Sequence, residues 1–258
     1  MAGNTAAPGT SVTSRVVAIL GAFDSSHRAL RLTDLAARAG LAVPTTHRLA
    51  GELVELDYLH RLEDGRFVVG RRLWEVGLLA PTQTGLRELA SPHLHDLYGA
   101  TLATVHLAVR EGDQVLYIDR LSGHASVPVV SRVGSRLPLH STGVGKVLLA
   151  FAPDAIQSAV LANLTRITPY TITQPGRLRA ELSRVRQEGY AQTNEEMSLG
   201  ACSVAVPVRG PDDQVIAALG IVVPTLRRER VRLVASLQVT AKGIQRVVSS
   251  LPLSGSPG

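Results

Sequence analysis

The sequence predicts an α+β protein built from two domains, and three observations lead to this prediction. The chain has 258 residues, of which 45% are hydrophobic, enough for one large or two ordinary domains with apolar cores. Residues 11–72 show the pattern of a winged helix-turn-helix, and residues 99–250 mix strand and helix patterns. Residues 73–98 lie between them and are expected to form a helical linker. The Gly- and Pro-rich residues 1–10 and 251–258 are expected to be disordered tails.

The first element of the smaller domain is an amphipathic helix over residues 12–23, where apolar residues recur every three or four positions. A short second helix covers residues 35–39, preceded by Thr33 as its N-cap and ended by Gly40, which can adopt a positive φ. Pro44 suits the first turn of a third helix because its φ is fixed and it lacks an N–H. Two helices joined by this tight turn make a helix-turn-helix.

A hairpin follows the third helix. Residues 58–62 and 66–69 have strand-like composition and flank Glu63-Asp64-Gly65, and an Asp-Gly pair between two such runs is a strong hairpin signal. A hairpin added to a helix-turn-helix makes a winged helix. Residues 71–79 and 86–98 then carry helical patterns on either side of Pro81, which marks the first candidate boundary.

The larger domain is expected to mix strands with helices in an α+β arrangement. Strand patterns cover residues 101–109, 114–120, 203–208 and 215–223. Helical patterns cover residues 145–151, 155–163, 177–188 and 228–248.

Composition narrows the setting and the partners. A single cysteine, Cys202, cannot form an internal disulfide or a multi-cysteine metal site, which fits a reducing compartment. Residues 1–14 do not have the pattern of a secretory leader, and no run approaches the roughly 18 apolar residues of a membrane span. We therefore expect a cytoplasmic protein with no membrane partner. The net charge is +6, yet residues 1–80 hold 9 Arg against 8 acidic residues, so charge alone does not locate a nucleic-acid site.

The start of the third helix is the candidate DNA-reading segment. The second helix of a helix-turn-helix enters the major groove with its first turn, where side chains meet base edges and free N–H groups favour phosphate. Arginines on the wing can reach the neighbouring DNA backbone. The expected DNA-binding residues are Thr45, Thr46, His47, Arg48, Arg61 and Arg66.

Two motifs resemble those of IclR-type transcriptional regulators. The first is the series Leu32-Thr33-Asp34-Leu35-Ala36, Gly40-Leu41, Thr45-Thr46-His47-Arg48-Leu49 and Asp64-Gly65-Arg66-Phe67. The second combines residues 132–150, which contain His140-Ser141-Thr142-Gly143-Val144-Gly145-Lys146, with Asn194-Glu195-Glu196 and Ser203-Val204-Ala205-Val206-Pro207-Val208. The resemblance covers roughly residues 12–250 and includes both motifs in the right order.

This resemblance implies a DNA-binding winged helix, a linker used for dimerisation, and a GAF-like domain with an antiparallel sheet that binds a small organic effector. Family members usually bind operator DNA as dimers or tetramers. One departure concerns the turn before the third helix, where Val43 and Pro44 replace the Lys and Ser that many members carry. The operator sequence therefore cannot be transferred from the family.

The resemblance also locates the effector site. Residues 140–146 form a glycine-punctuated turn that leads into an apolar helix, so backbone N–H groups and the helix dipole can favour a carboxylate. Ser203 stands where many members carry Cys, and on an alternating strand Cys202 faces the other way. The strand at residues 218–224 carries no polar side chain, which favours a larger acid, such as an aromatic carboxylate. The expected effector-binding residues are Thr142, Gly143, Val144, Ser203, Gly220 and Val222.

Enzyme interpretations are weaker. A phosphate-binding loop ending at Lys146 would need Gly at position 140 and Ser or Thr at 147, and the chain has His140 and Val147. A lone cysteine in a strand is more often a core residue than a nucleophile. Glu195 and Glu196 are interpreted as loop or helix-start residues. We expect no catalytic residues, no metal and no cofactor.

The sequence as a whole predicts a DNA-binding regulator, with a repressor favoured, of a catabolic or metabolic operon controlled by a small organic acid. The alternative is a small-molecule sensor or enzyme whose N-terminal domain mediates protein contacts, and the weak net charge of residues 1–80 is its best support. The arginines at residues 227–232 are interpreted as a solvated helical turn or a subunit contact, with Glu229 as an acidic partner.

Overall fold

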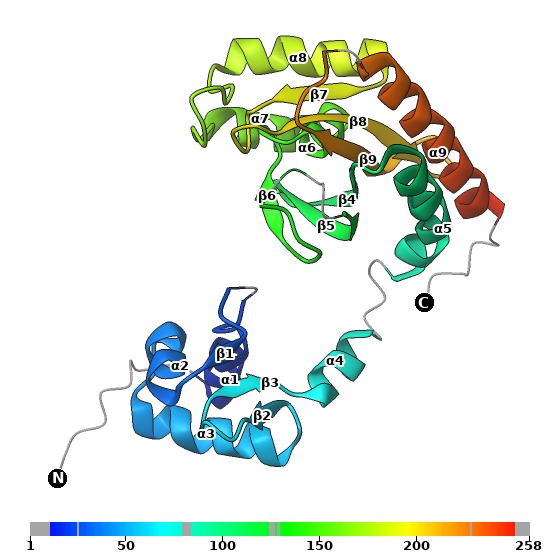
Figure 1. Cartoon of the computed structure of the whole chain (residues 1–258). Coiled ribbons are helices and arrows are strands. Elements are labelled where there is room, and N and C mark those ends of the chain that lie inside the picture. The colour runs from blue at the N-terminus through cyan, green and yellow to red at the C-terminus, as the bar shows by residue number, and fades with distance from the viewer. Residues whose placement is uncertain are drawn as a thin grey trace. The chain divides into compact units, whose positions relative to one another are not determined.

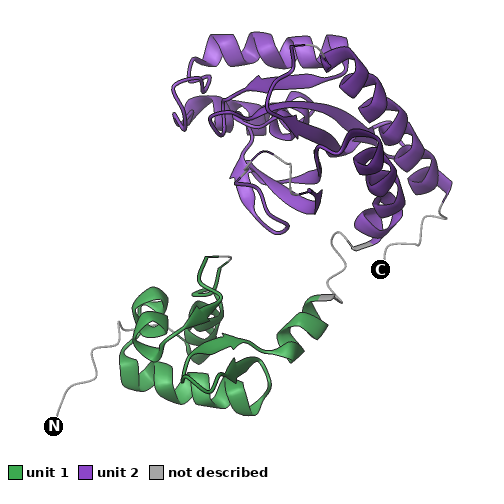
Figure 2. Cartoon of the chain, viewed as in Figure 1, with its two compact units in different colours: residues 1–82 green, residues 83–258 purple. Residues whose placement is uncertain are grey.

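The chain divides into two compact units, residues 1–82 and residues 83–258 (Figure 1 and Figure 2). The computed structural model describes residues 11–24, 26–78, 84–123, 127, 130–227 and 229–250. The two expected tails and Pro81 lie outside the described residues. The division between the units falls inside the linker expected at residues 73–98, so its first helix belongs to the smaller unit and its second to the larger.

The smaller unit is a winged helix-turn-helix. Its three-stranded antiparallel sheet has the order β1-β3-β2, with Leu30 opposite Phe67 and Leu59 opposite Val69. Buried side chains of the helices and strands form one apolar core, which includes Ile19 and Leu49. The elements are α1 (Val12–Leu20), β1 (Ala29–Leu30), α2 (Leu32–Ala39), α3 (Val43–Glu55), β2 (Leu59–Arg61), β3 (Phe67–Val69) and α4 (Arg71–Leu78).

Local signals explain most of these bounds, with two differences from the prediction. Gly40 ends α2 with a φ of 64°, as expected, and Pro44 lies in the first turn of α3. The expected cap at Thr33 is wrong, because α2 begins at Leu32 after Arg31 and Thr33 lies inside the helix. Strand β1 was not predicted, since two residues are too few to show a period.

The larger unit contains a six-stranded antiparallel sheet with the order β6-β5-β4-β9-β8-β7. The four expected strands and the four expected helices are present with bounds shifted by up to three residues. The strands β6 and β7, of three and four residues, were not predicted. The elements are α5 (Thr84–Thr101), β4 (Thr104–Glu111), β5 (Gln114–Leu121), β6 (Arg136–Pro138), α6 (Gly143–Ala150), α7 (Asp154–Ala162), α8 (Pro175–Glu188), β7 (Ala191–Asn194), β8 (Cys202–Arg209), β9 (Val215–Val223) and α9 (Arg230–Ser250).

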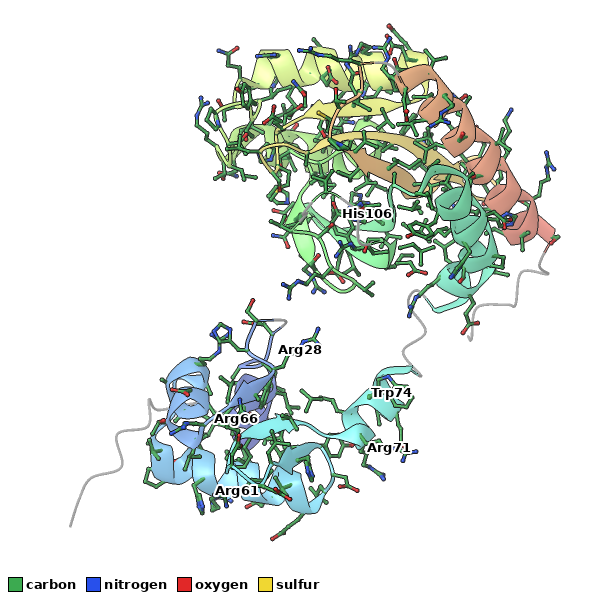
Figure 3. The ribbon with its side chains drawn as sticks, viewed as in Figure 1. Arg28, Arg61, Arg66, Arg71, Trp74 and His106 are labelled. Atoms are coloured by element: carbon green, nitrogen blue, oxygen red, sulfur yellow. The ribbon has the colours of Figure 1, made fainter. Side chains whose placement is uncertain are left out.

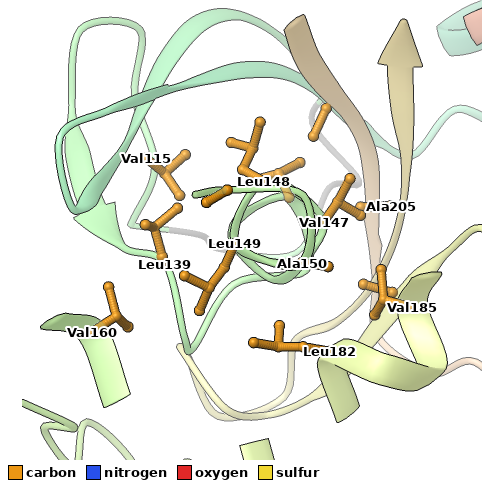
Figure 4. Packing of buried hydrophobic residues seen from close by; sticks show 14 of the residues in the cluster. Val115, Leu139, Val147, Leu148, Leu149, Ala150, Val160, Leu182, Val185 and Ala205 are labelled. Carbon is orange, nitrogen blue, oxygen red and sulfur yellow. The ribbon is translucent and has the colours of Figure 1, made fainter. Parts of the chain in front are cut away.

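Helices cover both faces of this sheet, so its central strands are buried on both sides. Helices α5 and α9 pack on one face against residues such as Leu107 and Leu219. Helices α6, α7 and α8 form the other core, where Val147 and Leu182 meet Ala205 (Figure 4). All eight residues of α6 are buried, so this short helix lies inside the unit. In the described part of the chain, no helix is both long and apolar enough to cross a membrane.

Candidate functional sites

The first two turns of α3 present three of the four predicted DNA-reading side chains. His47 and Arg48 are exposed and Thr45 is half-buried. Ala42 precedes the helix and provides no side-chain cap, so first-turn N–H groups remain available for a phosphate oxygen. Thr46 cannot contact DNA as predicted, because its side chain is fully buried and its hydroxyl donates to Ala42 O at 3.1 Å.

The wing places its two predicted arginines on the surface of the same unit (Figure 3). Arg61 lies over the Phe67 ring, with its guanidinium carbon 5.7 Å from the ring centroid. Arg66 donates to Asp64 at 2.7 Å, and this hydrogen bond lowers the pKa of Asp64. Arg28 is also exposed and lies just before β1, the edge strand that pairs with β3 (Figure 3).

The six predicted effector-binding residues come together around one cavity in the larger unit. They are contributed by α6, β8 and β9, on the face of the sheet that α6 covers. No Arg, Lys, Asp or Glu belongs to this lining in the described part of the chain. The cavity has a volume of about 50 Å³ and is open on one side, so a ligand can extend into its mouth. The other lining residues are His106, Tyr117, Val130, Ser131, Leu137, Thr193, Met197, Ser198, Ala201, Val204 and Ile221.

The N-terminus of α6 forms one polar end of this cavity. Thr142 caps the helix, because its Oγ1 accepts from Gly145 N at 3.1 Å. This cap leaves the N–H groups of Gly143 and Val144 for another acceptor. A Cβ atom at Gly143 would lie 2.5 Å from Ser203 Oγ, so only glycine lets the helix start approach β8 this closely. Ser203 Oγ also lies 2.6 Å from Thr193 Oγ1.

A second polar group in the lining consists of His106 on β4 and Ser131. His106 Nε2 lies 2.8 Å from Ser131 Oγ, and both residues are buried. Burial, with a smaller effect of Arg120, lowers the pKa of His106 to about 3, so its imidazole is neutral at pH 7. The Tyr117 ring meets the His106 ring edge-on, with centroids 5.0 Å apart, and burial raises the pKa of Tyr117. The prediction missed all three residues.

A buried ion pair ties α6 to the loop after β7. Lys146 is fully buried, and its Nζ lies 2.6 Å from Glu196 Oε1 and 3.9 Å from Glu181 Oε1. Burial raises the pKa of Glu196, and Lys146 opposes this shift. The loop position of Glu195 and Glu196 agrees with the prediction, but the burial of Glu196 was not foreseen. Because Met197 and Ser198 of the same loop line the cavity, this ion pair holds one of the cavity walls.

Cys202 faces away from the effector cavity, as the alternation of β8 predicts. It lines a second, polar cavity of about 1040 Å³, and its Sγ lies 2.9 Å from Asn194 Oδ1. Glu229 pairs with Arg232 at 2.9 Å, so the prediction of an acidic partner for this arginine cluster is confirmed. Among the described residues, no three His, Cys, Asp or Glu side chains form a group that could hold a metal ion.

A winged helix-turn-helix joined to a unit that encloses a small cavity defines a ligand-responsive transcriptional regulator. Comparison with known protein families identifies the family of regulators to which the chain belongs. Residues 12–63 match the IclR helix-turn-helix domain, and residues 79–246 match the bacterial transcriptional regulator IclR C-terminal domain. The chain belongs to the IclR family of transcriptional regulators, as the sequence motifs indicated.

Individual relatives agree with this assignment. The HTH-type transcriptional regulator XynR of Escherichia coli strain K12 is 34% identical over 216 residues, which cover 83% of this chain and 86% of XynR. The HTH-type transcriptional repressor AllR of the same strain is 27% identical and covers 96% of this chain and 93% of its own. A crystal structure of an IclR homolog from Microbacterium hydrocarbonoxydans, complexed with 4-hydroxybenzoate, has a TM-score of 0.89 and 35% identity. That match covers 93% of this chain and all of the other.

These relatives are regulators, not enzymes, and the chain is a DNA-binding transcriptional regulator with an effector-binding domain. The alternative of an enzyme or sensor whose N-terminal domain makes only protein contacts is set aside for the same reason.

Proposed function

We propose that this regulator represses a catabolic or metabolic operon in the cytoplasm and binds its operator as a symmetric dimer or tetramer. Thr45, His47 and Arg48 of α3 would read the major groove, and Arg61 and Arg66 of the wing would contact phosphates. This assignment is supported by the exposure of His47 and Arg48 near the uncapped start of α3 and by the exposure of the two arginines on the wing. The repressor role is supported by the similarity to AllR.

The effector is an aromatic carboxylate held in the cavity beside α6. The single observation that carries this step is the convergence of the Gly143 and Val144 N–H groups with Ser203 at one end of an otherwise apolar cavity. Because no charged side chain lines the cavity among the described residues, a carboxylate would be held by neutral donors and the helix dipole. The 4-hydroxybenzoate complex of the Microbacterium homolog supports an acid of this size.

Regulation requires the effector to bind two arrangements of the oligomer with different affinity, since equal affinity would shift nothing. One arrangement would match the spacing of the operator half-sites and the other would not. The loop after β7, held to α6 by the Lys146–Glu196 ion pair, is the part of the cavity wall best placed to respond to the effector.

The DNA-binding role is tested by capturing fragmented genomic DNA with the purified protein and sequencing what remains bound. The Arg48→Ala variant is the comparison, and Arg246→Ala on the exposed side of α9 is the matched control. We expect a recurring dyad that Arg246→Ala retains and that Arg48→Ala binds more weakly by about 1–3 kcal/mol. Binding that falls steeply with salt would confirm phosphate contacts. Equal enrichment by both variants would rule out the role of Arg48.

The effector class is tested by titration calorimetry of the full chain against benzoate and against short oxo-acids such as pyruvate. We expect benzoate to bind and pyruvate to bind more weakly, because an aromatic ring fills the apolar part of the cavity. Ser203→Val should weaken the binding of both acids, because it removes one donor to the carboxylate. Binding of pyruvate alone would overturn the aromatic class.

A further inference from the structure

The effector cavity has two polar ends with apolar residues between them. One end is the start of α6 with Ser203 on β8, and the other is the buried pair His106 and Ser131. Figure 3 labels His106 in the larger unit. Between them lie Gly220 and Val222 of the intervening strand β9, which are paired with His106 and Ser203 and so share their face of the sheet. A ligand that carries only a carboxylate would leave the second polar end without a partner.

The strand registers fix how far apart these ends are. Ser203 pairs with Val222, and Val222 pairs with Thr104, two residues before His106 on β4. Paired residues share a face of the sheet and the side-chain period is two, so Ser203 and His106 project from the same face. The close approach of Gly143 to Ser203 shows that this is the face covered by α6.

The separation matches one class of molecule. Two strand spacings of about 4.8 Å and two residue rises of about 3.4 Å place the Cα atoms of Ser203 and His106 about 12 Å apart. Because both side chains project from the same face of the sheet, their polar atoms are separated by a similar distance. Subtracting two hydrogen bonds of about 2.8 Å each leaves about 6 Å between the polar atoms of a ligand that reaches both ends. A benzene ring with a carboxylate and a para oxygen spans about 6–7 Å when built from ordinary bond lengths. A three-carbon oxo-acid reaches only one end.

The chemistry of the second end defines the para substituent. The Ser131 hydroxyl can donate one hydrogen bond and accept two, and His106 Nε2 uses one of these. Arg120 Nη1 donates to Ser131 O at 3.1 Å and so holds the serine in place. A neutral group that both donates and accepts fits here. A second carboxylate would be desolvated, because Arg120, the cation beside this end, already donates to Ser131 O.

We propose that His106 and Ser131 determine specificity by binding a para hydroxyl group on an aromatic carboxylate effector. This inference rests on the proposed aromatic carboxylate and adds the second point of recognition. His106 does not touch the carboxylate end, so its effect should appear as a difference between two ligands and not as a general loss of binding.

The test compares dissociation constants by titration calorimetry of the full chain with 4-hydroxybenzoate, benzoate, 3-hydroxybenzoate and terephthalate. We expect 4-hydroxybenzoate to bind about tenfold more tightly than benzoate, the effect of one buried hydrogen bond. The meta isomer should resemble benzoate because its hydroxyl lies too close to the carboxylate. Terephthalate should bind more weakly than benzoate.

Variants separate recognition of the hydroxyl from damage to the cavity. Ser131→Ala and His106→Phe should each bring the ratio of the benzoate and 4-hydroxybenzoate constants close to one while benzoate binding persists. Ser198→Ala removes another hydroxyl from the same lining and should leave the ratio unchanged. Ser131→Ala deletes a single oxygen and keeps the test valid if His106→Phe fails to fold.

Three outcomes would overturn the inference, and one of them would also overturn the proposed effector class. Equal affinity of the wild-type protein for benzoate and 4-hydroxybenzoate would refute the role of His106 and Ser131 and leave the aromatic carboxylate class intact. Absence of binding by every aromatic acid would refute the effector class as well. A tenfold ratio that survives in Ser131→Ala and His106→Phe would also refute the assignment of these two residues.

Discussion

The two candidate sites both use the start of a helix, but α3 and α6 present that start in opposite ways. Helix α3 begins after Ala42 with no side-chain cap, and its first turn carries exposed side chains. Helix α6 is capped by Thr142, and all eight of its residues are buried. The first arrangement suits a large polyanion that approaches from solvent, whereas the second suits a small anion enclosed by protein.

This difference determines which amino-acid substitutions each site can tolerate. Recognition at α3 depends on side chains that contribute little to folding, such as Arg48, whose pairing with Glu52 at 2.5 Å is exposed. Recognition at α6 depends on backbone N–H groups and close packing. The residues that form the effector site therefore also belong to the core of the larger unit. We therefore expect substitutions at α6 to affect stability and substitutions on the exposed side of α3 to affect DNA binding alone.

The largest effect should come from Lys146→Met, which replaces the buried ammonium on α6 with a side chain of similar length. Glu196 would then be a buried carboxylate without its partner, and breaking such a pair costs about 3–5 kcal/mol. Urea denaturation followed by circular dichroism measures the loss.

The double variant Lys146→Met, Glu196→Gln is the control for this prediction. It removes both charges, so it should recover a large part of the stability that the single variant loses. A single variant that unfolds at the wild-type urea concentration would contradict the view that this ion pair supports the larger unit.

The next largest effect should come from Gly145→Ala in the first turn of α6. The added Cβ would overlap Leu139 O and the capping Oγ1 of Thr142, and backbone atoms cannot move aside easily. Overpacking of this kind costs up to about 3 kcal/mol, and we expect that upper end. Thermal unfolding should show the loss, and benzoate binding should weaken with it because the cap positions the effector-binding N–H groups. A variant as stable as the wild type would show that α6 is less tightly enclosed than its packing indicates.

The contrast between the two sites also explains which of their features could be predicted from the sequence. The winged helix was predictable because its signals are local, namely Gly40, Pro44 and the Asp64-Gly65 turn. The effector-site positions followed from the resemblance to a family and not from periodicity. The burial of Thr46 was also within reach, since it shares the spacing of Leu49 and Leu53 on the apolar side of α3.

The remaining features depend on contacts between distant segments. Lys146 lies in an otherwise apolar run, which signals a buried charge that needs a partner, but Glu196 is fifty residues away. The pairing of His106 with Ser131 spans 25 residues and depends on the strand order of the sheet. Strands as short as β6 and β7 exist because longer neighbours provide their hydrogen bonds, so their own sequences show no clear pattern.

An effect of intermediate size should appear as the pH falls. In the unfolded chain His106 takes up a proton near its ordinary pKa of 6.5, whereas in the folded larger unit its pKa is about 3. The unfolded state therefore binds more protons between these values, and the contribution of His106 to stability is complete above pH 6.5 and lost as the pH falls toward 3. At pH 5 the loss amounts to about 2 kcal/mol.

Unfolding free energies at pH 7 and pH 5 test this prediction. His106→Phe should reduce the difference between the two pH values, while the exposed His60 on the wing provides a matched control in His60→Phe. The prediction fails if both variants keep the wild-type pH dependence. Hydrogen exchange resolved by segment should place the acid-sensitive loss in the larger unit.

The smallest expected effect is a gain in stability, and it comes from Gly51 in the interior of α3. Gly51 lies inside α3, and a Cβ added there would meet no atom within 4 Å. Replacing it with alanine lowers the conformational entropy of the unfolded chain, so Gly51→Ala should stabilise the smaller unit by about 0.5–1 kcal/mol. Urea denaturation of this unit measures the gain, and a loss of stability would show that α3 is as closely packed at Gly51 as α6 is at Gly145. Opposite signs for the same substitution would show that α6 is enclosed at Gly145 and that α3 has free space at Gly51.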